Sequence, residues 1–321
     1  LASGIIFIVA GVALMKGVKL IKLEVNFVSL VGLVFLVSGL IYLSTCLILE
    51  RIPSHRSAVV LLVSLIVLFA SVSQVPIKEV LIKDSYVYSL SDLEKYDMIV
   101  VNLKIVGGSL KVLSLGSSDV AINLTFTAFY FPLVMEKGGF KVSESEIGGR
   151  FVLDVRAYLS EVVLGLGPKE TILNVDSEAS GSKVLLRERS GLRILNVNSS
   201  IGGVEFEGED LRGVEEVNLR SYVGDLKLKL SIRGEERTKI MAFSELGPVD
   251  VKLLIKRPEA SWLFVGETRA GRLYAEVSVP HVVRFSSPWE LVLSSKEELE
   301  KRHVEINAKS DIGSVKFSVI W

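Results

Sequence analysis

The chain repeats one eight-residue phrase from Ser199 to its end. The phrase reads Ser or Thr, any residue, a small or aliphatic residue, Gly, any residue, and then apolar residues two and four places after the Gly. Five copies start at positions 199, 221, 244, 268 and 310, so the spacings are 22, 23, 24 and 42 residues. A period in the twenties is typical of a solenoid, in which each coil buries its apolar face only against neighbouring coils.

Each copy predicts a corner followed by a strand with one buried face. After Gly224, apolar side chains at 226, 228, 230 and 232 alternate with Lys227, Lys229 and Ser231, which is the period-two pattern of a strand. Gly permits a positive φ at the corner, and the preceding Ser or Thr can bond to nearby backbone in the turn. We expect the corner glycines to stack at one edge: Gly202, Gly224, Gly247, Gly271 and Gly313. The alternative is an antiparallel sandwich with glycine turns, but hairpins do not require a constant spacing.

Other segments fit the phrase less well. Gly108 and Gly149 each precede alternating apolar residues, and the segment 286–293 keeps the frame with Trp289 in the glycine position, which predicts a degenerate coil. Residues 91–94 have capping-box spacing, so a brief helical turn is expected there. A second helical turn is expected over 296–302, where charged residues lack strand periodicity.

The N-terminal part predicts membrane helices. Residues 27–49 and 57–77 carry no charge, and each is long enough to cross a hydrocarbon core of about 30 Å. Residues 1–15 are apolar but shorter, and we interpret them as a short or truncated first span. The expected organisation is therefore three transmembrane helices in 1–77, a juxtamembrane adaptor in 78–98 and a β-solenoid in 99–321.

Charge and cysteine usage limit the partners and the location. Lysine plus arginine equals aspartate plus glutamate at 37 each, so the chain has no electrostatic footprint for nucleic acid. The single cysteine, Cys46, lies in a predicted span, which leaves the β part without a disulfide. Basic residues lie in both loops between the predicted spans, and these loops must lie on opposite sides of the membrane. The positive-inside rule therefore does not decide the orientation. Glycosylation sequons at Asn123 and Asn198 favour an extracytoplasmic β domain.

Motifs for chemistry are scarce. The histidines at 55, 281 and 303 are scattered, and the sequence contains no Gly-x-Ser-x-Gly elbow. The Gly165–Pro168 segment resembles the start of a phosphate loop but is more simply a turn. We therefore expect no catalytic, cofactor-binding or metal site and no cofactor. Trp262, Trp289 and Trp321 suggest either a sugar-binding strip or core and end-cap packing.

The repeats resemble a known family. The Ser/Thr-x-Ile/Val-Gly-x-Val/Leu-x-Phe/Leu phrase is similar to that of toastrack domains, also described as adhesin domains, whose β-repeats stack in a solenoid. The segments 4–11 and 26–33 resemble the membrane part of envelope-stress regulators of the LiaF kind. The resemblance covers residues 100–321 and implies a non-enzymatic membrane protein that senses or assembles through its β domain. An array of this length and three spans depart from the family pattern.

The leading functional hypothesis is a membrane-anchored β-solenoid that acts as an envelope sensor, regulator or protein-interaction scaffold. A surface adhesin or carbohydrate-binding module is the alternative, and a membrane-tethered polysaccharide-active enzyme is the third hypothesis. The partners expected are the lipid bilayer and either another protein or a second copy. Because the last strand ends with the chain, we expect it to be an open edge that docks a partner or a second copy through Phe317, Val319, Ile320 and Trp321. The alternative is that Trp321 folds back as a hydrophobic plug.

Overall fold

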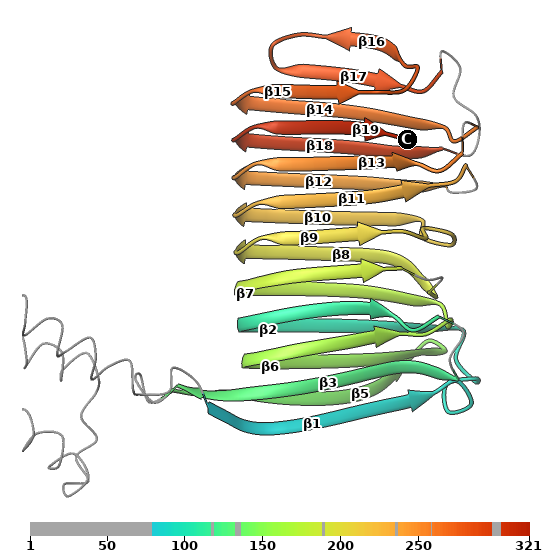
Figure 1. Ribbon diagram of the computed structural model, residues 1–321. Helices are drawn as coiled ribbons and strands as arrows, with labels where there is room; N and C mark the ends of the chain where they lie inside the picture. Colours follow the sequence, from blue (N-terminus) through green and yellow to red (C-terminus); the bar gives the residue numbers. More distant parts are fainter. Residues whose placement is uncertain are drawn as a thin grey trace, which may run out of the picture. The chain divides into compact units, whose positions relative to one another are not determined.

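A computed structural model describes residues 79–116, 119–131, 136–187, 190–234, 237–257, 259–296 and 303–321. Every regular element in these residues is a strand, which confirms the all-β prediction (Figure 1). No helix in this part of the chain is long and apolar enough to cross a membrane. The predicted spans 1–15, 27–49 and 57–77 lie outside the described residues, as does most of the helical turn expected over 296–302.

Nineteen strands run from Glu79 to Ile320. They are β1 (Glu79–Ser89), β2 (Met98–Ser114), β3 (Val120–Phe131), β4 (Glu136–Lys137), β5 (Gly139–Ile147), β6 (Arg150–Leu166), β7 (Thr171–Leu186), β8 (Leu192–Ile201), β9 (Val204–Gly208), β10 (Glu216–Val223), β11 (Leu226–Ile232), β12 (Thr238–Leu246), β13 (Val249–Ile255), β14 (Trp262–Ala270), β15 (Leu273–Val277), β16 (Val282–Ser286), β17 (Glu290–Ser294), β18 (Val304–Ile312) and β19 (Val315–Ile320).

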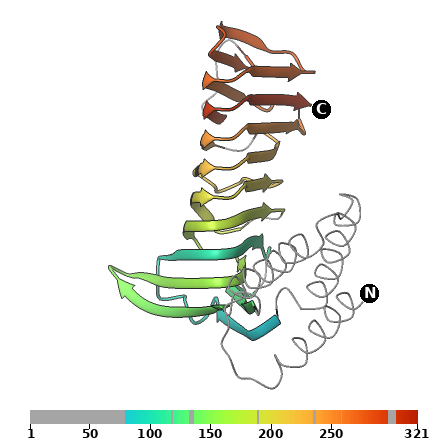
Figure 2. The same ribbon diagram turned by 90° about the vertical axis from the view of Figure 1, so that its left-hand side faces the viewer.

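The compact unit formed by Val80–Phe129 and Lys137–Trp321 is a stack of coils with two layers of parallel strands. Each repeat copy joins a strand of the first layer to one of the second layer, as in β10 and β11. Strand β10 pairs in parallel with β8 and β12, and β11 pairs in parallel with β9 and β13. Because the repeat copies pair in parallel, the alternative of antiparallel hairpins between them is wrong. Figure 2 views this stack from its corner edge.

Three coils have no interruption at the corner. Strands β6, β2 and β7 run through both layers, and β2 stays in register with β6 from Met98 opposite Arg150 to Ser114 opposite Leu166. The chain turns within these strands at Leu159, Gly107 and Ala179, whose φ angles are 45°, 68° and 53°. These corners therefore use a residue with positive φ but not the Ser-x-x-Gly phrase. Gly108 lies beside this corner, whereas Gly149 lies in the turn between β5 and β6, so its assignment as a repeat corner was wrong.

The spatial order of the coils departs from the sequence order at both ends of the stack. Strand β2 lies between β6 and β7, and it pairs in parallel with both. At the other end, β18 lies between β12 and β14, and β19 lies between β13 and β15. The last coil of the chain is therefore an internal coil of the stack (Figure 1).

Antiparallel strands cover parts of the two end coils. Strands β3 and β5 pair with β6 in the opposite direction, and β17 pairs with β14 in the same manner. Strands β16 and β17 form a hairpin whose turn contains Trp289. The degenerate coil predicted over 286–293 is thus wrong, because this segment leaves the stack and returns as β18.

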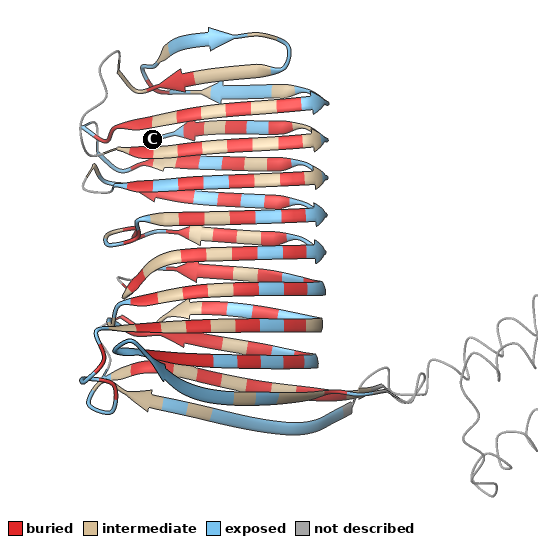
Figure 3. Ribbon diagram, turned by 180° about the vertical axis from the view of Figure 1, so that it is seen from behind, coloured by how far each residue is buried: buried red, intermediate tan, exposed pale blue. Residues whose placement is uncertain are grey.

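The core lies between the two layers. Leu226, Leu228 and Ile232 are fully buried, as the alternation predicted, and the same rows continue through the neighbouring coils. Buried positions alternate with less buried ones along the strands that enclose the core, such as β10 to β14, whereas β1, β5 and β16 are mostly exposed (Figure 3). Near the β14 end, the Phe264 and Phe317 rings stack with centroids 3.9 Å apart, and both are buried. Continuous burial of this kind replaces the disulfides that the β part lacks.

The predicted adaptor is mostly strand. Strand β1 begins at Glu79, and a single turn follows it at residues 90–95. The reciprocal bonds of a capping box connect Ser89 and Asp92: the Asp92 amide donates to Ser89 Oγ at 3.1 Å, and the Ser89 amide donates to Asp92 Oδ2 at 3.2 Å. The predicted start at Ser91 was therefore two residues too late, and the turn does not continue into a helix.

Candidate interaction surface

The corner glycines form one column along an edge of the stack. A Cβ placed on Gly224 would lie under 3.0 Å from the carbonyl oxygen of Gly202. The same relation connects Gly247 to Gly224 and Gly313 to Gly247. The φ angles of Gly224, Gly247 and Gly313 lie between 148° and 153°, a region that side-chain-bearing residues rarely adopt. Glycine is thus required here for two reasons, the backbone angle and the close approach of the next coil.

Gly271 also lies in this column, but for only one of these reasons. Its φ lies outside the positive region, and its added Cβ would meet the carbonyl oxygen of Gly313 under 3.0 Å away. The column therefore runs Gly202, Gly224, Gly247, Gly313, Gly271, with the last two exchanged relative to the sequence. At Gly271 the phrase therefore requires glycine because of the contact between coils and not because of a left-handed backbone angle.

The Ser or Thr of the phrase links neighbouring coils. Ser244 Oγ donates to the Gly224 carbonyl at 3.1 Å, and Ser310 Oγ donates to the Gly247 carbonyl at 2.9 Å. Thr268 Oγ1 donates to the Gly313 carbonyl at 3.0 Å. These hydroxyls were expected to bond within their own turn, and only Ser199 does so, to Gly202 at 3.2 Å. The Ser and Thr side chains are buried, and each bond provides the hydroxyl with a partner.

An exposed aliphatic row runs beside the glycine column, and we name it the corner ridge. It consists of Ile201, Val223, Leu246 and Ile312, whose exposed fractions are 58%, 44%, 47% and 59%. Val223 is in register with Ile201 and Leu246, and Leu246 is in register with Ile312, so the four occupy neighbouring coils. Exposed positions gather at these strand ends in Figure 3. A contiguous apolar row of this kind marks an interaction site more often than single exposed apolar residues do.

Backbone bonds hold the corner ridge in place. The amides of Gly202, Gly224 and Gly247 donate to the carbonyls of Val223, Leu246 and Ile312 at 2.8, 2.9 and 3.0 Å. Three of the four ridge residues are therefore fixed by the glycine of the adjacent coil while their side chains stay exposed. The ridge is therefore a row of regularly spaced side chains on a rigid backbone, which reduces the entropy lost when a partner binds.

An asparagine ladder covers the outer face of the first layer. The amides of Asn218, Asn196, Asn174 and Asn102 each donate to the next side chain at 2.8 Å, and Asn102 donates to Asp154 at the end. Each bond crosses from one coil to the next, because these residues are in register on β10, β8, β7, β2 and β6. The ladder stabilises the stack and gives this face a polar, well-ordered surface.

The outer face of the second layer is charged and internally paired. Glu205 accepts hydrogen bonds from Lys183 and Lys229 at 3.0 Å each, and these bonds hold its pKa below the usual range. The bond to Glu205 likewise raises the pKa of Lys229. This arrangement across β7, β9 and β11 balances the charges around Glu205, and we interpret it as part of a solvated face.

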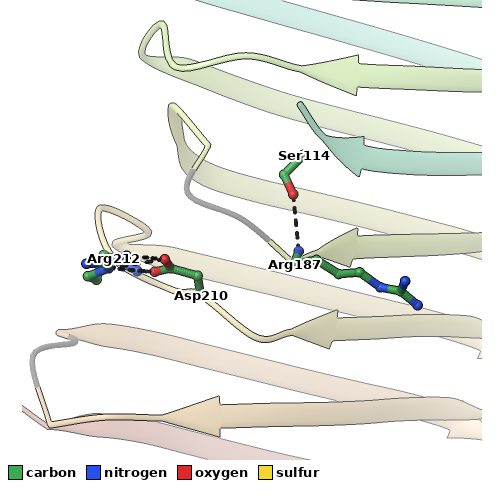
Figure 4. Close-up of polar contacts among 4 residues, drawn as sticks. All are labelled: Ser114, Arg187, Asp210 and Arg212. Carbon is green, nitrogen blue, oxygen red and sulfur yellow. Dashed lines mark hydrogen bonds and ion pairs between the residues drawn. The ribbon is translucent and has the colours of Figure 1, made fainter. Parts of the chain in front are cut away.

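The edge opposite the corners carries the loops between coils. Arg212 donates to Asp210 through Nε at 2.9 Å, and the Arg187 amide donates to Ser114 Oγ at 3.1 Å (Figure 4). Asp210 is only 7% exposed, and the bonds from Arg212 lower its pKa. The first contact stabilises the loop between β9 and β10, the second joins the ends of β7 and β2, and we assign both a structural role.

The predicted open edge at the C-terminus is wrong. Strand β19 is paired with β13 on one side and β15 on the other, because the last coil is inserted into the stack. Phe317 and Val319 are fully buried and face the core, whereas Ile320 and Trp321 are 49% and 57% exposed. The first two therefore have no surface for docking. Docking through Ile320 and Trp321 stays a prediction.

The residues considered for chemistry or sugar binding do not converge. Within the described residues, no group of three His, Cys, Asp or Glu side chains is placed to hold a metal ion. Trp262 is buried in the core, and the exposed Trp289 and Trp321 belong to a hairpin turn and to the end of β19. The three tryptophans thus form no strip along one face.

Comparison with known proteins gives fold-level similarity only. No family model matches the chain, and no curated protein matches it. Among solved structures, a proposed cell adhesion protein from Clostridium sporogenes aligns with 74% of this chain and 99% of its own, at 13% identity and a TM-score of 0.46. A proposed adhesin from Bacteroides fragilis aligns with 74% of this chain and 97% of its own, at 12% identity and a TM-score of 0.29.

Proposed function

We propose that this chain is a non-enzymatic, membrane-anchored, toastrack-like β-solenoid that acts in the cell envelope as a sensor or protein-interaction scaffold. Its β domain, on the extracytoplasmic side, associates with a second copy through the corner ridge. The observation that carries the proposal is the row of four exposed aliphatic side chains on neighbouring coils. The predicted spans in 1–77 would hold two copies in one plane and raise their effective concentration.

A second copy suits the ridge because the ridge repeats with the spacing of the strands, about 4.8 Å. Two ridges related by a two-fold axis have the same spacing between side chains, as a self-complementary contact requires. In the antiparallel arrangement, Ile201 of one copy lies opposite Ile312 of the other, and Val223 lies opposite Leu246. The same axis places Arg269 opposite Glu178. Both side chains are well exposed, and within its own chain Arg269 pairs with Asp311 at 3.3 Å and Glu178 pairs with Lys104 at 3.2 Å.

The antiparallel arrangement is favoured over the parallel one by these charges. Register places Glu178 on the coil next to Ile201, and Arg269 on the coil next to Ile312. Opposite charges at both ends of the contact favour the encounter and fix its register. Four side chains bury less than the roughly 800 Å² per partner of a stable interface, so the expected association is weak outside the membrane.

The oligomeric state tests this proposal. Leu246→Glu puts a charge into the centre of the ridge, and chemical crosslinking of the full chain in the membrane should change from dimer to monomer. Ile320→Glu is the matched control, because Ile320 is exposed to 49% and Leu246 to 47%. Circular dichroism should show both variants folded. Loss of the dimer in Ile320→Glu alone would assign docking to the C-terminal residues and contradict the ridge.

A further inference from the structure

A hollow of about 410 Å³ lies on the outer face of the first layer, over β5, β6 and β2. Its lining includes three cations, Lys104, Lys141 and Arg156, and no carboxylate. Val106 and the half-exposed Tyr158 supply apolar surface beside them. The hollow lies away from the corner ridge residues, and neither the proposed function nor the fold needs its charge.

The three cations lie side by side along the stack. Arg156 is in register with Lys141 on one side and with Lys104 on the other. Like charges directly opposite each other in a sheet are destabilising. Of the three, Lys104 has an exposed ion pair, with Glu178 at 3.2 Å, while Lys141 and Arg156 form no ion pair within the described part of the chain.

Elsewhere the same stack matches opposite charges on neighbouring coils. Lys309 pairs with Glu267 at 3.2 Å, and Arg220 pairs with Glu245 at 3.0 Å. Arg193 lies between Glu170 and Glu215 and pairs with both. Among the strand registers in the described ranges, the row at Arg156 is the longest run of one sign. Like charges also stand opposite each other at Lys229 and Lys252, but only as a pair. The row at the hollow sets three cations side by side, and two of them, Arg156 and Lys141, have no ion pair within the described residues.

Three carboxylates beside the row lie outside the lining and are engaged, and the first of them, Glu178, pairs with Lys104 at 3.2 Å. Asp154, two residues before Arg156 on β6, accepts the amide of Asn102 at 2.8 Å. Asp176 follows Lys104 in the row and accepts the amide of Asn198 at 3.2 Å. These groups limit the positive row at the β7 side, and β5 ends it on the other side.

We propose that this hollow binds a multivalent anion that carries two or three carboxylate or phosphate groups. Three strands at a spacing of about 4.8 Å set the cations over about 10 Å, so a ligand with several charges uses the row better than a single ion does. Arg156, at the centre, offers a bidentate fork to one oxyanion group, and the two lysines act as flexible point charges at either side. Val106 and Tyr158 contact the body of the ligand.

Calorimetry on the full chain in detergent tests the proposal with two probes. Tripolyphosphate carries phosphate groups and trigalacturonate carries carboxylates, so their relative affinities identify the group that the site prefers. Arg156→Gln should weaken binding of the preferred probe about tenfold or more, which corresponds to about 1.4 kcal/mol. Affinity in the wild-type protein should also fall as salt increases. Lys252→Gln, an exposed lysine on the other layer, is the matched control and should leave binding unchanged.

The melting temperature without ligand and the affinity for inorganic phosphate are two further tests. Without ligand, Arg156→Gln or Lys141→Gln should melt at or above the wild-type temperature, because each substitution removes like-charge repulsion. Inorganic phosphate should bind at least tenfold more weakly than the preferred probe. The proposal is overturned if neither probe binds at millimolar concentration, if Arg156→Gln and Lys141→Gln both retain full affinity, or if inorganic phosphate binds as tightly as the oligoanions.

Discussion

Replacing Gly224 with alanine should destabilise the β domain more than a surface substitution does, because two separate costs act at this position. The φ of 148° is strained for a residue with a side chain, at a cost of about 1–3 kcal/mol. The new Cβ would also lie 2.6 Å from the Gly202 carbonyl carbon and closer still to its oxygen. Backbone cannot yield as a flexible side chain does, and overpacking of this kind costs about 1–3 kcal/mol.

The two costs can be measured apart, because the chain offers a glycine for each. Gly213 has a φ of 89° and nothing within 4 Å of an added Cβ, so Gly213→Ala reports strain alone. Gly271 has no positive φ but meets the Gly313 carbonyl, so Gly271→Ala reports contact alone. Gly139→Ala, with neither, should change nothing. We expect the loss at Gly224 to approach the sum of the first two, about 4 kcal/mol in total.

Thermal unfolding of the full chain, followed by the strand signal in circular dichroism, is the assay. For a domain of this size, each kcal/mol shifts the melting temperature by about 2–4 °C, so Gly224→Ala should melt about 8–16 °C below the wild type. A Gly224→Ala protein that melts with the wild type would refute the corner geometry. A loss equal to that of Gly213→Ala would refute the close contact between coils.

Three other variants test separate parts of the stack. Ser310→Ala should cost about 1 kcal/mol in thermal unfolding, since it removes the bond to the Gly247 carbonyl. Ser221→Ala should cost less, because Ser199 still bonds to the Gly202 carbonyl, and equal losses would contradict this accounting. Asp210→Asn should cost about 1–2 kcal/mol at pH 7. Because the folded pKa of Asp210 is lowered, the stability that it contributes is present above its ordinary pKa of 3.8 and is lost as the pH falls through the folded pKa. The two proteins should therefore converge in stability in acid. Deleting residues 303–321 leaves β13 and β15 without their shared neighbour, and hydrogen exchange should show lost protection in both strands. Unchanged protection in β13 would contradict the inserted order.

The repeat phrase predicted the corners and the buried faces because both depend on local spacing. It did not predict which coil neighbours which, since the phrase at Gly313 is the same whether its coil stacks on Gly247 or on Gly271. The 42-residue gap did signal an excursion, yet the frame around Trp289 suggested a further coil where the chain forms a hairpin. The coils at β6, β2 and β7 were harder to recognise, because Leu159 and Ala179 turn the corner without glycine.

The surface features depended even more on register. The corner ridge had a signal in the sequence, because an aliphatic residue precedes the glycine in most copies. Two-residue alternation of the buried positions does not continue through a corner, so it did not predict the exposure of that residue. The positive row brings together residues 104, 141 and 156, and no sequence pattern relates them before the strands β5, β6 and β2 are aligned.

Crosslinking between copies tests the central claim, self-association through the corner ridge, most directly. In a Cys46→Ser background, Ile201→Cys and Ile312→Cys proteins are made separately and mixed in the membrane under mild oxidation. The antiparallel ridge contact predicts a disulfide-linked heterodimer in the mixture and little product from either variant alone. The control is Lys252→Cys mixed with Ile312→Cys, which should give no disulfide-linked dimer. No crosslink in the mixture, or equal crosslinking by Ile201→Cys alone, would contradict the account.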